Sequence, residues 1–366
     1  MSTNPATVGN VQEGSFYLDV GGALTIRLVN ASEKHRRRVA AQLNAREVTP
    51  GVPHITVLFV DRVASGPICR QGLIHTGWCG DDYYLLDRST GAARASLPIG
   101  RLEGAVEMTC ASTERDVPGL AELVRLKLLD EGFVAAHASA VRHEGLGLVP
   151  MGWAKGGKTG AVLAFARQGA AFVGDEWIAF SNDGTTMFGI GRSIKVTDRH
   201  LALFPRAAAQ VGHTQRLLWR IGRGVERREL RALAAVMPRV TDRFAIRAKE
   251  GEVFAVPLEA ARSSPDVLFL MINTDVDDVR VEPSATRELA ARMAAVGSFE
   301  RSVLNRWYEG FRYAFPGRRD PVLDGAAERE QAMLEQAFAG KQAFTVAHRH
   351  PGPLEPLFAA MVEVVR

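Results

Sequence analysis

The sequence predicts an α/β protein (α+β overall), with a β-rich N-terminal domain over residues 1–115 and an α/β domain over residues 116–366. Short β-branched and aromatic runs, broken by Gly, Asp and Ser, fill the first part of the chain, which is typical of antiparallel sheets. In the second part a strand, a glycine-rich turn, a helix and another strand follow one another, which indicates a parallel or mixed sheet. A chain of 366 residues can bury full cores that need neither disulfides nor metals.

The N-terminal domain is expected to consist of strands joined by short turns. Residues 16–30 show partial alternation and are interrupted at Gly21 and Gly22. A β-branched and aromatic run covers 54–60, and residues 83–86 follow a turn-like Gly-Asp-Asp sequence. Such punctuation at short intervals favours an antiparallel sheet, whose role the sequence does not reveal.

The C-terminal domain is expected to begin with a helix over 118–130, where apolar residues recur at spacings of three and four. Strands over 133–141 and 145–151, a helix over 157–168 and strands over 171–180 follow. The later expected elements are a basic helical stretch over 215–237, a buried strand over 266–273, a mainly helical segment over 283–313 and an amphipathic helix over 353–365.

Composition and charge argue against several classes of protein. The hydrophobic content of 46% excludes wholesale disorder, and a formal net charge of +4 is too small to indicate nucleic-acid binding. Cys69, Cys79 and Cys110 form no CxxC pair, so no zinc site is expected, and unpaired thiols suit a reducing compartment. The N-terminus lacks the apolar segment of a signal peptide, and no long apolar run is evident, so we expect a cytoplasmic protein without a membrane partner.

The strongest motif lies between the expected strand at 145–151 and the helix that follows it. Gly152-Trp153-Ala154-Lys155-Gly156-Gly157-Lys158-Thr159, followed by Gly160, matches G-x-x-x-x-G-K-[ST], a phosphate-binding loop. Glycines let backbone N–H groups curl round a phosphate, and the positive end of the helix dipole points at it. Lys158 would meet the β- and γ-phosphates and Thr159 would meet Mg²⁺. The flanking strand and helix favour a nucleotide site over a chance glycine-rich turn.

Two carboxylates and a histidine are candidate partners of this loop. Asp175 and Glu176 follow the next expected strand, where one carboxylate commonly holds Mg²⁺ and a second could take a proton from an attacking hydroxyl. The structural alternative is an exposed acidic turn. His137 lies near the end of the strand expected before the loop and could approach the phosphates, although a histidine packed in the core is the more frequent case.

The order His-Ala-Ser (137–139), the loop (152–159) and Val-Gly-Asp-Glu (173–176) resembles the HPr kinase/phosphorylase family and its stand-alone relatives. The resemblance covers residues 118–200, extends weakly to the C-terminus and does not reach residues 1–115. It implies an HPr-kinase-like P-loop domain that transfers phosphate from ATP to a hydroxyl with Mg²⁺ as cofactor.

The resemblance implies a role for each matched residue. Lys158 and Thr159 correspond to the phosphate and Mg²⁺ residues of the loop, and Asp175 corresponds to a general base toward a serine hydroxyl. Glu176 corresponds to a Mg²⁺ ligand, and His137 to a histidine that supports the site. We therefore expect Asp175, His137 and Lys158 to be catalytic, and Thr159, Glu176 and Asp175 to hold the metal.

The chain also departs from the family pattern. The family loop reads G-x-S-G-x-G-K-[ST], whereas this chain has Ala154 in place of the Ser and Lys155 in place of the second Gly. The family's later E-x-R-G-x-G motif is missing, and Gly189-Ile190-Gly191-Arg192 stands in that region. Because that motif is tied to the HPr substrate and the reverse reaction, neither is expected here.

These observations predict an ATP- and Mg²⁺-dependent kinase that phosphorylates a hydroxyl, of serine type, on a peptide, protein or small molecule. The altered loop and the missing motif leave an alternative open, a nucleotide-binding regulatory or scaffold protein without phosphotransfer. A ligase or hydrolase on the same loop is a third hypothesis. No nucleic-acid partner is expected, and the resemblance is compatible with a homo-oligomer.

Several other features have simpler interpretations. The basic run at 34–38 and the arginines of 216–231 are interpreted as solvated faces, although either could meet an anionic partner. Arg192 and Lys195 could reach the transferred phosphate. The aromatic residues of 307–315 are interpreted as a helix face packed in a core or subunit interface. His348 and His350, two residues apart, are not expected to bind a metal.

Overall fold

The computed structural model describes residues 14–64, 66–191, 194–196, 200, 203–209, 211–212, 246–248, 250–256 and 262–365. The basic stretch over 215–237 and Arg192 lie outside the described residues, as does the side chain of Lys195. The described chain mixes helices and strands, as expected of an α/β protein, and forms two compact units. Unit 1 comprises Met1–Ala136, Ala179–Thr185 and Ala290–Ala339, and unit 2 comprises His137–Ile178, Thr186–Leu289 and Gly340–Arg366. Unit 1 thus continues past residue 115, and a domain boundary at that residue stays a prediction.

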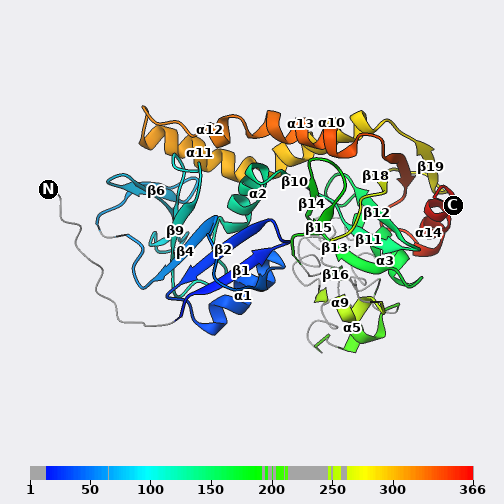
Figure 1. Cartoon of the computed structure of the whole chain (residues 1–366), viewed down its shortest axis with the longest axis horizontal. Coiled ribbons are helices and arrows are strands. Elements are labelled where there is room, and N and C mark those ends of the chain that lie inside the picture. The colour runs from blue at the N-terminus through cyan, green and yellow to red at the C-terminus, as the bar shows by residue number, and fades with distance from the viewer. Residues whose placement is uncertain are drawn as a thin grey trace, which may run out of the picture. The chain divides into compact units, whose positions relative to one another are not determined.

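Unit 1 contains a nine-stranded sheet (Figure 1), in the order β3-β1-β2-β4-β9-β8-β7-β6-β5. Its strands are β1 (Phe16–Val20), β2 (Leu24–Val29), β3 (Arg46–Glu47), β4 (Ile55–Val60), β5 (Cys69–Gln71), β6 (Thr76–Cys79), β7 (Asp82–Leu86), β8 (Ala93–Leu97) and β9 (Val106–Ala111). The expected β-rich region is therefore present. The expectation of a purely antiparallel sheet is wrong, because β2, β4 and β9 run parallel to one another at its centre.

The parallel pairing of β2 and β4 depends on a helix that the sequence analysis did not anticipate. Helix α1 (Glu33–Leu43) connects the two strands, and a parallel pair needs such a crossover. Ser32 caps its N-terminus in a capping box with His35, whose ring stacks on Phe59 at 4.2 Å. The basic run at 34–38 belongs to this helix, and Arg36 and Arg37 both pair with Glu33. An intrahelical carboxylate thus offsets part of the charge that suggested an anionic partner.

The remaining elements of unit 1 are mainly helical. They are α2 (Leu120–Asp130), β10 (Phe133–Ala136), most of β14 (Ile178–Ser181) and α10 (Thr286–Glu300), α11 (Ser302–Ala314), α12 (Pro321–Asp324) and α13 (Ala326–Phe338). The aromatic stripe lies on α11, where Phe311 is fully buried and meets the ring of Tyr83 edge to face at 5.7 Å. Tyr308 and Trp307 join the same cluster. The interpretation of this stripe as a packed helix face is confirmed for Trp307, Tyr308, Phe311 and Phe315, whereas Tyr313 is 73% exposed.

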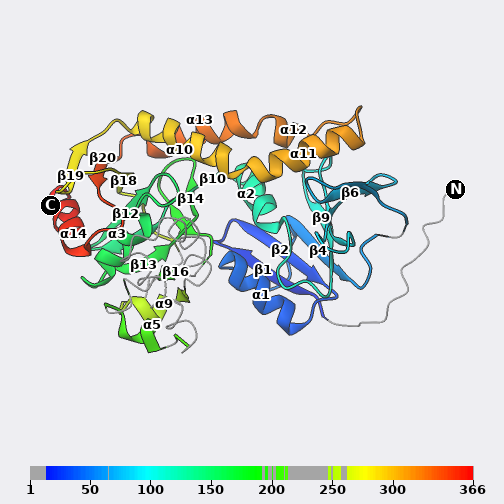
Figure 2. The same cartoon turned by 180° about the vertical axis from the view of Figure 1, so that it is seen from behind.

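Unit 2 contains a six-stranded mixed sheet in the order β13-β11-β12-β18-β20-β19. Its strands are β11 (Ala140–His143), β12 (Leu146–Met151), β13 (Ala171–Gly174), β18 (Val267–Asn273), β19 (Arg280–Pro283) and β20 (Gln342–His348). Strands β12, β18 and β20 are parallel, so their carboxyl ends meet at one edge of the sheet. Helix α3 (Lys158–Ala166) lies beside α14 (Leu354–Glu363), as both views show (Figures 1 and 2), and Phe165 meets Phe358 between them.

Short elements complete the described part of unit 2. They are β15 (Met187–Gly189), β16 (Ile194–Val196), α5 (Pro205–Ala209), β17 (Ile246–Ala248) and α9 (Glu250–Val253), with β16 and β17 forming a two-stranded ladder. No helix in the described part of the chain combines the length and the apolarity that crossing a membrane requires.

One strand expected to be continuous is interrupted in the structure, and the strands expected over 171–180 are divided at the acidic pair. The expected strand over 133–141 is divided into β10 and β11, with His137-Ala138-Ser139 between them. The expected strands over 171–180 are separated by Asp175-Glu176-Trp177, which lie between β13 and β14. Both interruptions fall at the candidate site residues, where polar side chains replace the apolar pattern of the strands.

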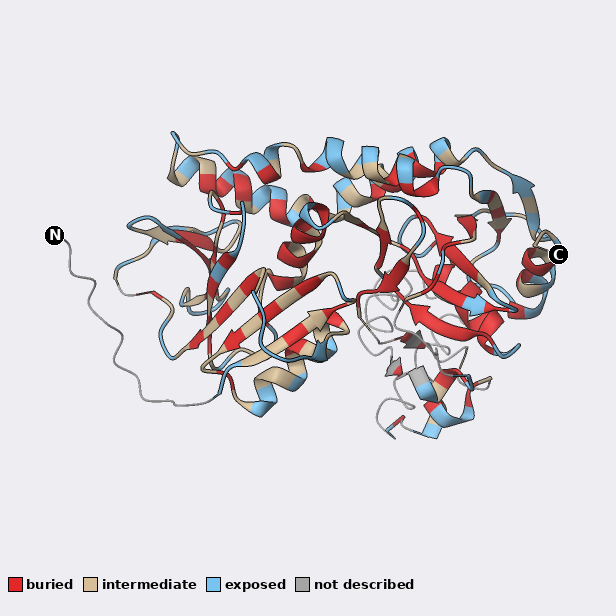
Figure 3. Cartoon of the chain, in the orientation of Figure 1, coloured by how far each residue is buried: buried red, intermediate tan, exposed pale blue. Residues whose placement is uncertain are grey.

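The strands beside the loop in unit 2 are buried more continuously than β2 and β4 of unit 1 (Figure 3). Strands β2 and β4 alternate between buried and half-buried residues along their whole length. In unit 2, β13 is buried throughout, and β12 and β18 are buried at five consecutive positions each. Continuous burial is expected of parallel strands that are covered on both faces. The apolar core of unit 2 lies around α3, β12, β18 and α14.

Candidate nucleotide site

The candidate site lies in unit 2, at the carboxyl end of β12. Residues 152–157 leave this strand and lead directly into α3. Strand β12 lies in the sheet beside β18, which in turn pairs with β20 in parallel register. Ligands of open α/β sheets commonly bind outside the carboxyl ends of such strands. The strand, glycine-rich turn and helix predicted from the sequence are therefore present in the predicted order.

The loop backbone depends on its glycines. Gly152 and Gly157 have φ values of 137° and 101°, which side-chain-bearing residues rarely adopt. A Cβ atom at Gly152 would also lie 2.9 Å from the carbonyl oxygen of Met271, and one at Gly157 would overlap the ring of His348. Lys155 is in the left-handed region too, with φ of 63°. Lys155, which replaces a glycine of the family loop, thus has a backbone conformation that a glycine would adopt without strain.

Lys158 folds across this loop. Its side chain is only 6% exposed, and Nζ donates hydrogen bonds of 2.9 Å to the carbonyl oxygens of Gly152 and Trp153. The N-terminus of α3 is capped by Gly157, so no side-chain cap occupies the first N–H groups of the helix. The N–H groups of a first helical turn, the helix dipole and a buried ammonium group together favour an anion at this point. Trp153, in the same loop, is 50% exposed.

Asp175 lies at the end of β13 and points into the protein. Its side chain is 3% exposed; Ser139 Oγ donates a hydrogen bond to it at 2.5 Å, and Thr159 Oγ1 lies 3.2 Å from both carboxylate oxygens. Burial raises the pKa of Asp175, while the hydrogen bonds from Ser139 and Thr159 and the charge of Lys158 oppose that shift. The structure therefore brings Asp175, Thr159 and Ser139 together at one buried point.

Glu176 is arranged differently from its neighbour. Its side chain is exposed, whereas Asp175 is buried, so the two adjacent carboxylates face different surroundings. The backbone of Glu176 has φ of 71° and its N–H group donates to Asp175. A left-handed backbone at a non-glycine residue costs of order 1–3 kcal/mol and is found most often at functional sites.

His137 lies beside the acidic segment. Its half-buried ring stacks on Trp177 with a centroid distance of 5.6 Å, and Trp177 follows Asp175 by two residues. The neighbouring Ser139 donates its backbone N–H to the carbonyl of Pro150 in β12. His137 is thus placed on the side of the site formed by residues 175–177.

Two side chains of the site were missed by the sequence analysis. Ser139 stands within the quoted His-Ala-Ser motif, yet no role was assigned to it, because a lone serine gives no signal of its contact with Asp175. His348 was considered only as a metal ligand, and its ring instead meets Gly156 and Gly157 of the loop. Both contacts join residues far apart in the chain, so local spacing does not predict them.

The donor set of the site suits Mg²⁺ better than a transition metal. Among the described residues, no group of three or more His, Cys, Asp or Glu side chains could hold a metal ion by itself. Protein sites for Mg²⁺ with nucleotides use one or two carboxylates, while water and phosphate oxygens complete the coordination. The adjacent Thr159 hydroxyl and Asp175 carboxylate fit that pattern.

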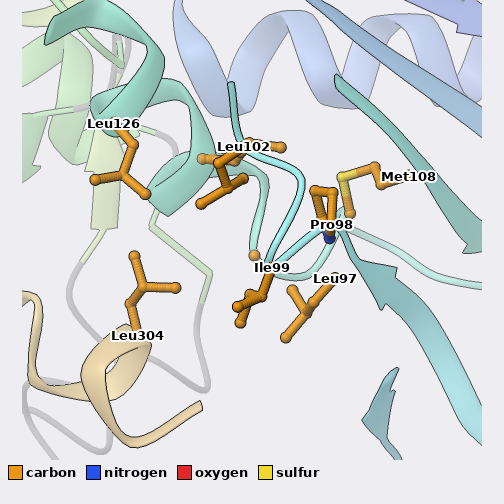
Figure 4. Close-up of a pocket in the computed structure, with 9 residues that line it drawn as sticks. Leu97, Pro98, Ile99, Leu102, Met108, Leu126 and Leu304 are labelled. Atoms are coloured by element: carbon orange, nitrogen blue, oxygen red, sulfur yellow. The ribbon is translucent and has the colours of Figure 1, made fainter. Parts of the chain in front are cut away.

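Unit 1 contains an apolar cavity (Figure 4), whereas the candidate site in unit 2 is built from polar side chains. The cavity is lined by Leu97, Pro98, Ile99, Leu102, Met108, Gly119, Leu123, Leu126 and Leu304. Its volume of about 10 Å³ is enough for one water molecule at most and too small for an organic substrate. The cavity is lined by apolar residues alone, and the candidate site residues lie in unit 2.

A scan against protein-family models gives no match for this chain, and neither does a comparison with curated proteins. The function proposed below therefore rests on the loop and on the side chains around it.

Proposed function

We propose that the protein is an ATP- and Mg²⁺-dependent phosphotransferase that phosphorylates a hydroxyl group. The observation that carries this proposal is that a phosphate-binding type of loop and a buried carboxylate lie together at one edge of the sheet. A glycine loop closed by Lys158 leads into α3, and Thr159 of the same helix lies beside the buried Asp175. This combination suits a nucleoside triphosphate better than a simple anion, because it offers donors for phosphates and an acceptor for a metal.

The loop and the helix would bind the phosphates. The first N–H groups of α3 and the Lys158 ammonium group both provide positive charge at the loop. On nucleotide binding, Lys158 Nζ would exchange its two carbonyl partners for β- and γ-phosphate oxygens, which are stronger acceptors because they are charged. The half-exposed ring of Trp153 would lie close to the bound nucleotide.

Thr159 and Asp175 would hold Mg²⁺, which supplies charge neutralisation at the phosphates when it is bound. Their side-chain oxygens are 3.2 Å apart. Ser139 keeps the Asp175 carboxylate oriented by donating to Oδ1. The resemblance assigns a general base and a Mg²⁺ ligand to Asp175 and Glu176. The buried position of Asp175 beside Thr159 favours the role of Mg²⁺ ligand for Asp175.

Glu176 would then be the better candidate for the general base. Its exposed carboxylate is accessible to an acceptor, whereas Asp175 is enclosed. In the transfer, the acceptor oxygen forms a bond to the γ-phosphorus as the bond from that phosphorus to ADP breaks, and the hydroxyl proton passes to the carboxylate. Positioning and charge stabilisation carry most of the rate in such reactions.

The experiment that tests the proposal uses γ-labelled ATP with Mg²⁺ and an extract of the source organism, because the acceptor is not identified. The full-length chain is expected to transfer label to a protein, peptide or small molecule of the extract. Asp175→Asn is expected to abolish transfer, and Glu176→Gln to reduce it while Mg²⁺ dependence stays the same. Absence of any labelled product or of ADP release by the wild-type chain, in the presence of ATP binding, would overturn the proposal.

The burial of Asp175 favours a second candidate, a nucleotide-binding regulatory protein without phosphotransfer. Asp175 is only 3% exposed, and in this second candidate its carboxylate holds Thr159 and the loop in place and takes no part in a reaction. That protein would bind Mg·ATP and release no ADP, and Asp175→Asn would alter binding alone. The labelling experiment distinguishes the two candidates.

A further inference from the structure

His348-Arg349-His350 is a motif that neither metal binding nor the proposed catalysis uses. It begins at the last residue of β20, at the same sheet edge as the loop. The side chain of His348 is 4% exposed, and its Nε2 lies 2.9 Å from the carbonyl oxygen of Gly156. A carbonyl oxygen can only accept, so Nε2 carries the proton and donates to Gly156.

The absence of a side chain at Gly157 makes this contact possible. The Cε1 and Nε2 atoms of His348 occupy the position that a Cβ atom at residue 157 would need. The ring therefore lies against the peptide that joins Gly156 to Gly157. A peptide between two glycines has few steric limits on its orientation, so an added hydrogen bond decides which way it faces.

Strand β18 fixes the backbone that carries this histidine. Asn273 pairs with His348 in the parallel ladder, and the N–H of Thr274 donates to the His348 carbonyl at 2.9 Å. The Asn273 side chain accepts the N–H of His350 at 2.8 Å. The ring of His348 is thus held from one side by β18 while it donates to the loop on the other.

We propose that His348 is a positioning residue of the nucleotide site: it holds the Gly156–Gly157 peptide so that the Gly157 N–H is presented to the phosphates of Mg·ATP. In a planar trans peptide, the C=O of one residue and the N–H of the next point in opposite directions. The Gly156 carbonyl faces His348, so the Gly157 N–H faces away from it. This inference rests on the proposed function, since it names the residue that prepares the loop for the nucleotide.

The test compares three variants of the full-length chain by calorimetric titration with Mg·ATP. His348→Gln keeps a donor near the Nε2 position, whereas His348→Asn is too short to reach the carbonyl, and His348→Ala removes the donor. We expect the dissociation constant to rise about tenfold in His348→Ala and His348→Asn, and by less than about threefold in His348→Gln, because a neutral hydrogen bond contributes on this scale.

His143 provides the matched control. It is also a buried histidine of unit 2, on β11, and its ring packs against Phe165 and Phe358 rather than against the loop. His143→Ala is expected to lower the melting temperature without changing the affinity of the folded protein for Mg·ATP. Asn273→Ala removes the side chain that accepts the His350 N–H and so loosens the backbone that positions the His348 ring. It is expected to weaken binding by a few-fold and serves if His348→Ala does not fold.

The outcomes separate the two proposals. Equal affinities of the wild type, His348→Asn and Asn273→Ala would overturn the positioning role while leaving the nucleotide site intact. A loss of affinity in His348→Gln as large as in His348→Ala would also overturn it, because the donor is retained. A wild-type chain that binds no Mg·ATP would overturn the proposed function and this inference together.

Discussion

Buried polar groups serve different ends in the two units. In unit 1, Asp320 accepts the backbone N–H groups of Gly100 and Val322, and Lys127 donates to the Leu102 carbonyl and to Asp130. Each of these groups joins two pieces of chain within the unit. In unit 2, four buried polar residues gather around one loop instead: Ser139, Lys158, Asp175 and His348.

The two units also differ in the burial of particular strands. Strands β2 and β4 alternate between buried and half-buried residues, whereas β12, β13 and β18 are buried almost continuously and the polar site residues follow the ends of β12 and β13. Under the proposed function, the buried charges of unit 1 join pieces of chain, whereas those of unit 2 prepare a binding site. The following predictions test that division.

The largest expected effect is on turnover. Asp175→Asn is expected to reduce phosphoryl transfer by about a thousandfold, because loss of a group that acts in the transition state has effects of this order. Asp320→Asn, a substitution of a buried aspartate in unit 1, is expected to leave the turnover per folded molecule unchanged. Rates of ADP release at saturating Mg·ATP measure both. A comparable loss in the two variants would break the comparison between the units.

Substitution of Asp320 is expected to affect stability rather than turnover. Both oxygens of Asp320 accept N–H groups, at 2.6 Å from Gly100 and 3.1 Å from Val322. An asparagine there would direct an NH₂ group at one of these donors, so we expect Asp320→Asn to lower the free energy of unfolding by about 2 kcal/mol. Urea titrations followed by circular dichroism measure the change, and an unaltered midpoint would contradict it.

The pH dependence of stability sharpens the same contrast. Burial raises the folded-state pKa of Asp175 above its unfolded value, so the folded state binds the proton more tightly than the unfolded one. The stability linked to this group is present at low pH and is lost as the pH rises through the folded pKa. Its partners Ser139 and Thr159 are hydroxyls that can reverse their hydrogen bonds and accept from an amide.

Asp175→Asn is therefore expected to stabilise the chain at neutral pH, and the gain is expected to shrink as the pH falls. Melting temperatures of the wild type and the variant between pH 4 and pH 8 measure it. A stability gain that grows toward acid pH would contradict the view that burial of the ionised Asp175 carboxylate destabilises the folded chain.

The smallest expected effect concerns Lys155. Its φ of 63° costs of order 1–3 kcal/mol, which glycine would relieve at the expense of about 0.5–1 kcal/mol of chain entropy. We expect Lys155→Gly to raise the free energy of unfolding by about 0.5–1 kcal/mol. Lys155→Ala, which removes the charge and keeps the strain, is the control, and an equal gain in both would show that charge rather than backbone strain is responsible.

The features predicted from the sequence are those encoded in short stretches of chain. The loop at 152–159, α3 and the position of Asp175 at a strand end all follow from neighbouring residues. The contact of Ser139 with Asp175 spans 36 residues and that of His348 with Gly156 spans 192, so only the folded sheet brings them together. Likewise, α1 escaped prediction because its basic run lacks a strong apolar stripe, although the Ser32 cap precedes it.

The central claim, that residues 152–159 form a working nucleotide site, is tested most directly by calorimetric titration of the full-length chain with Mg·ATP beside Lys158→Ala. Lys158 Nζ is the one side-chain cation that the described structure folds across the loop. We expect the wild type to bind and the variant to lose at least about 100-fold in affinity, because charged hydrogen bonds to two phosphates disappear. Equal binding by both chains, or binding by neither, would contradict the claim.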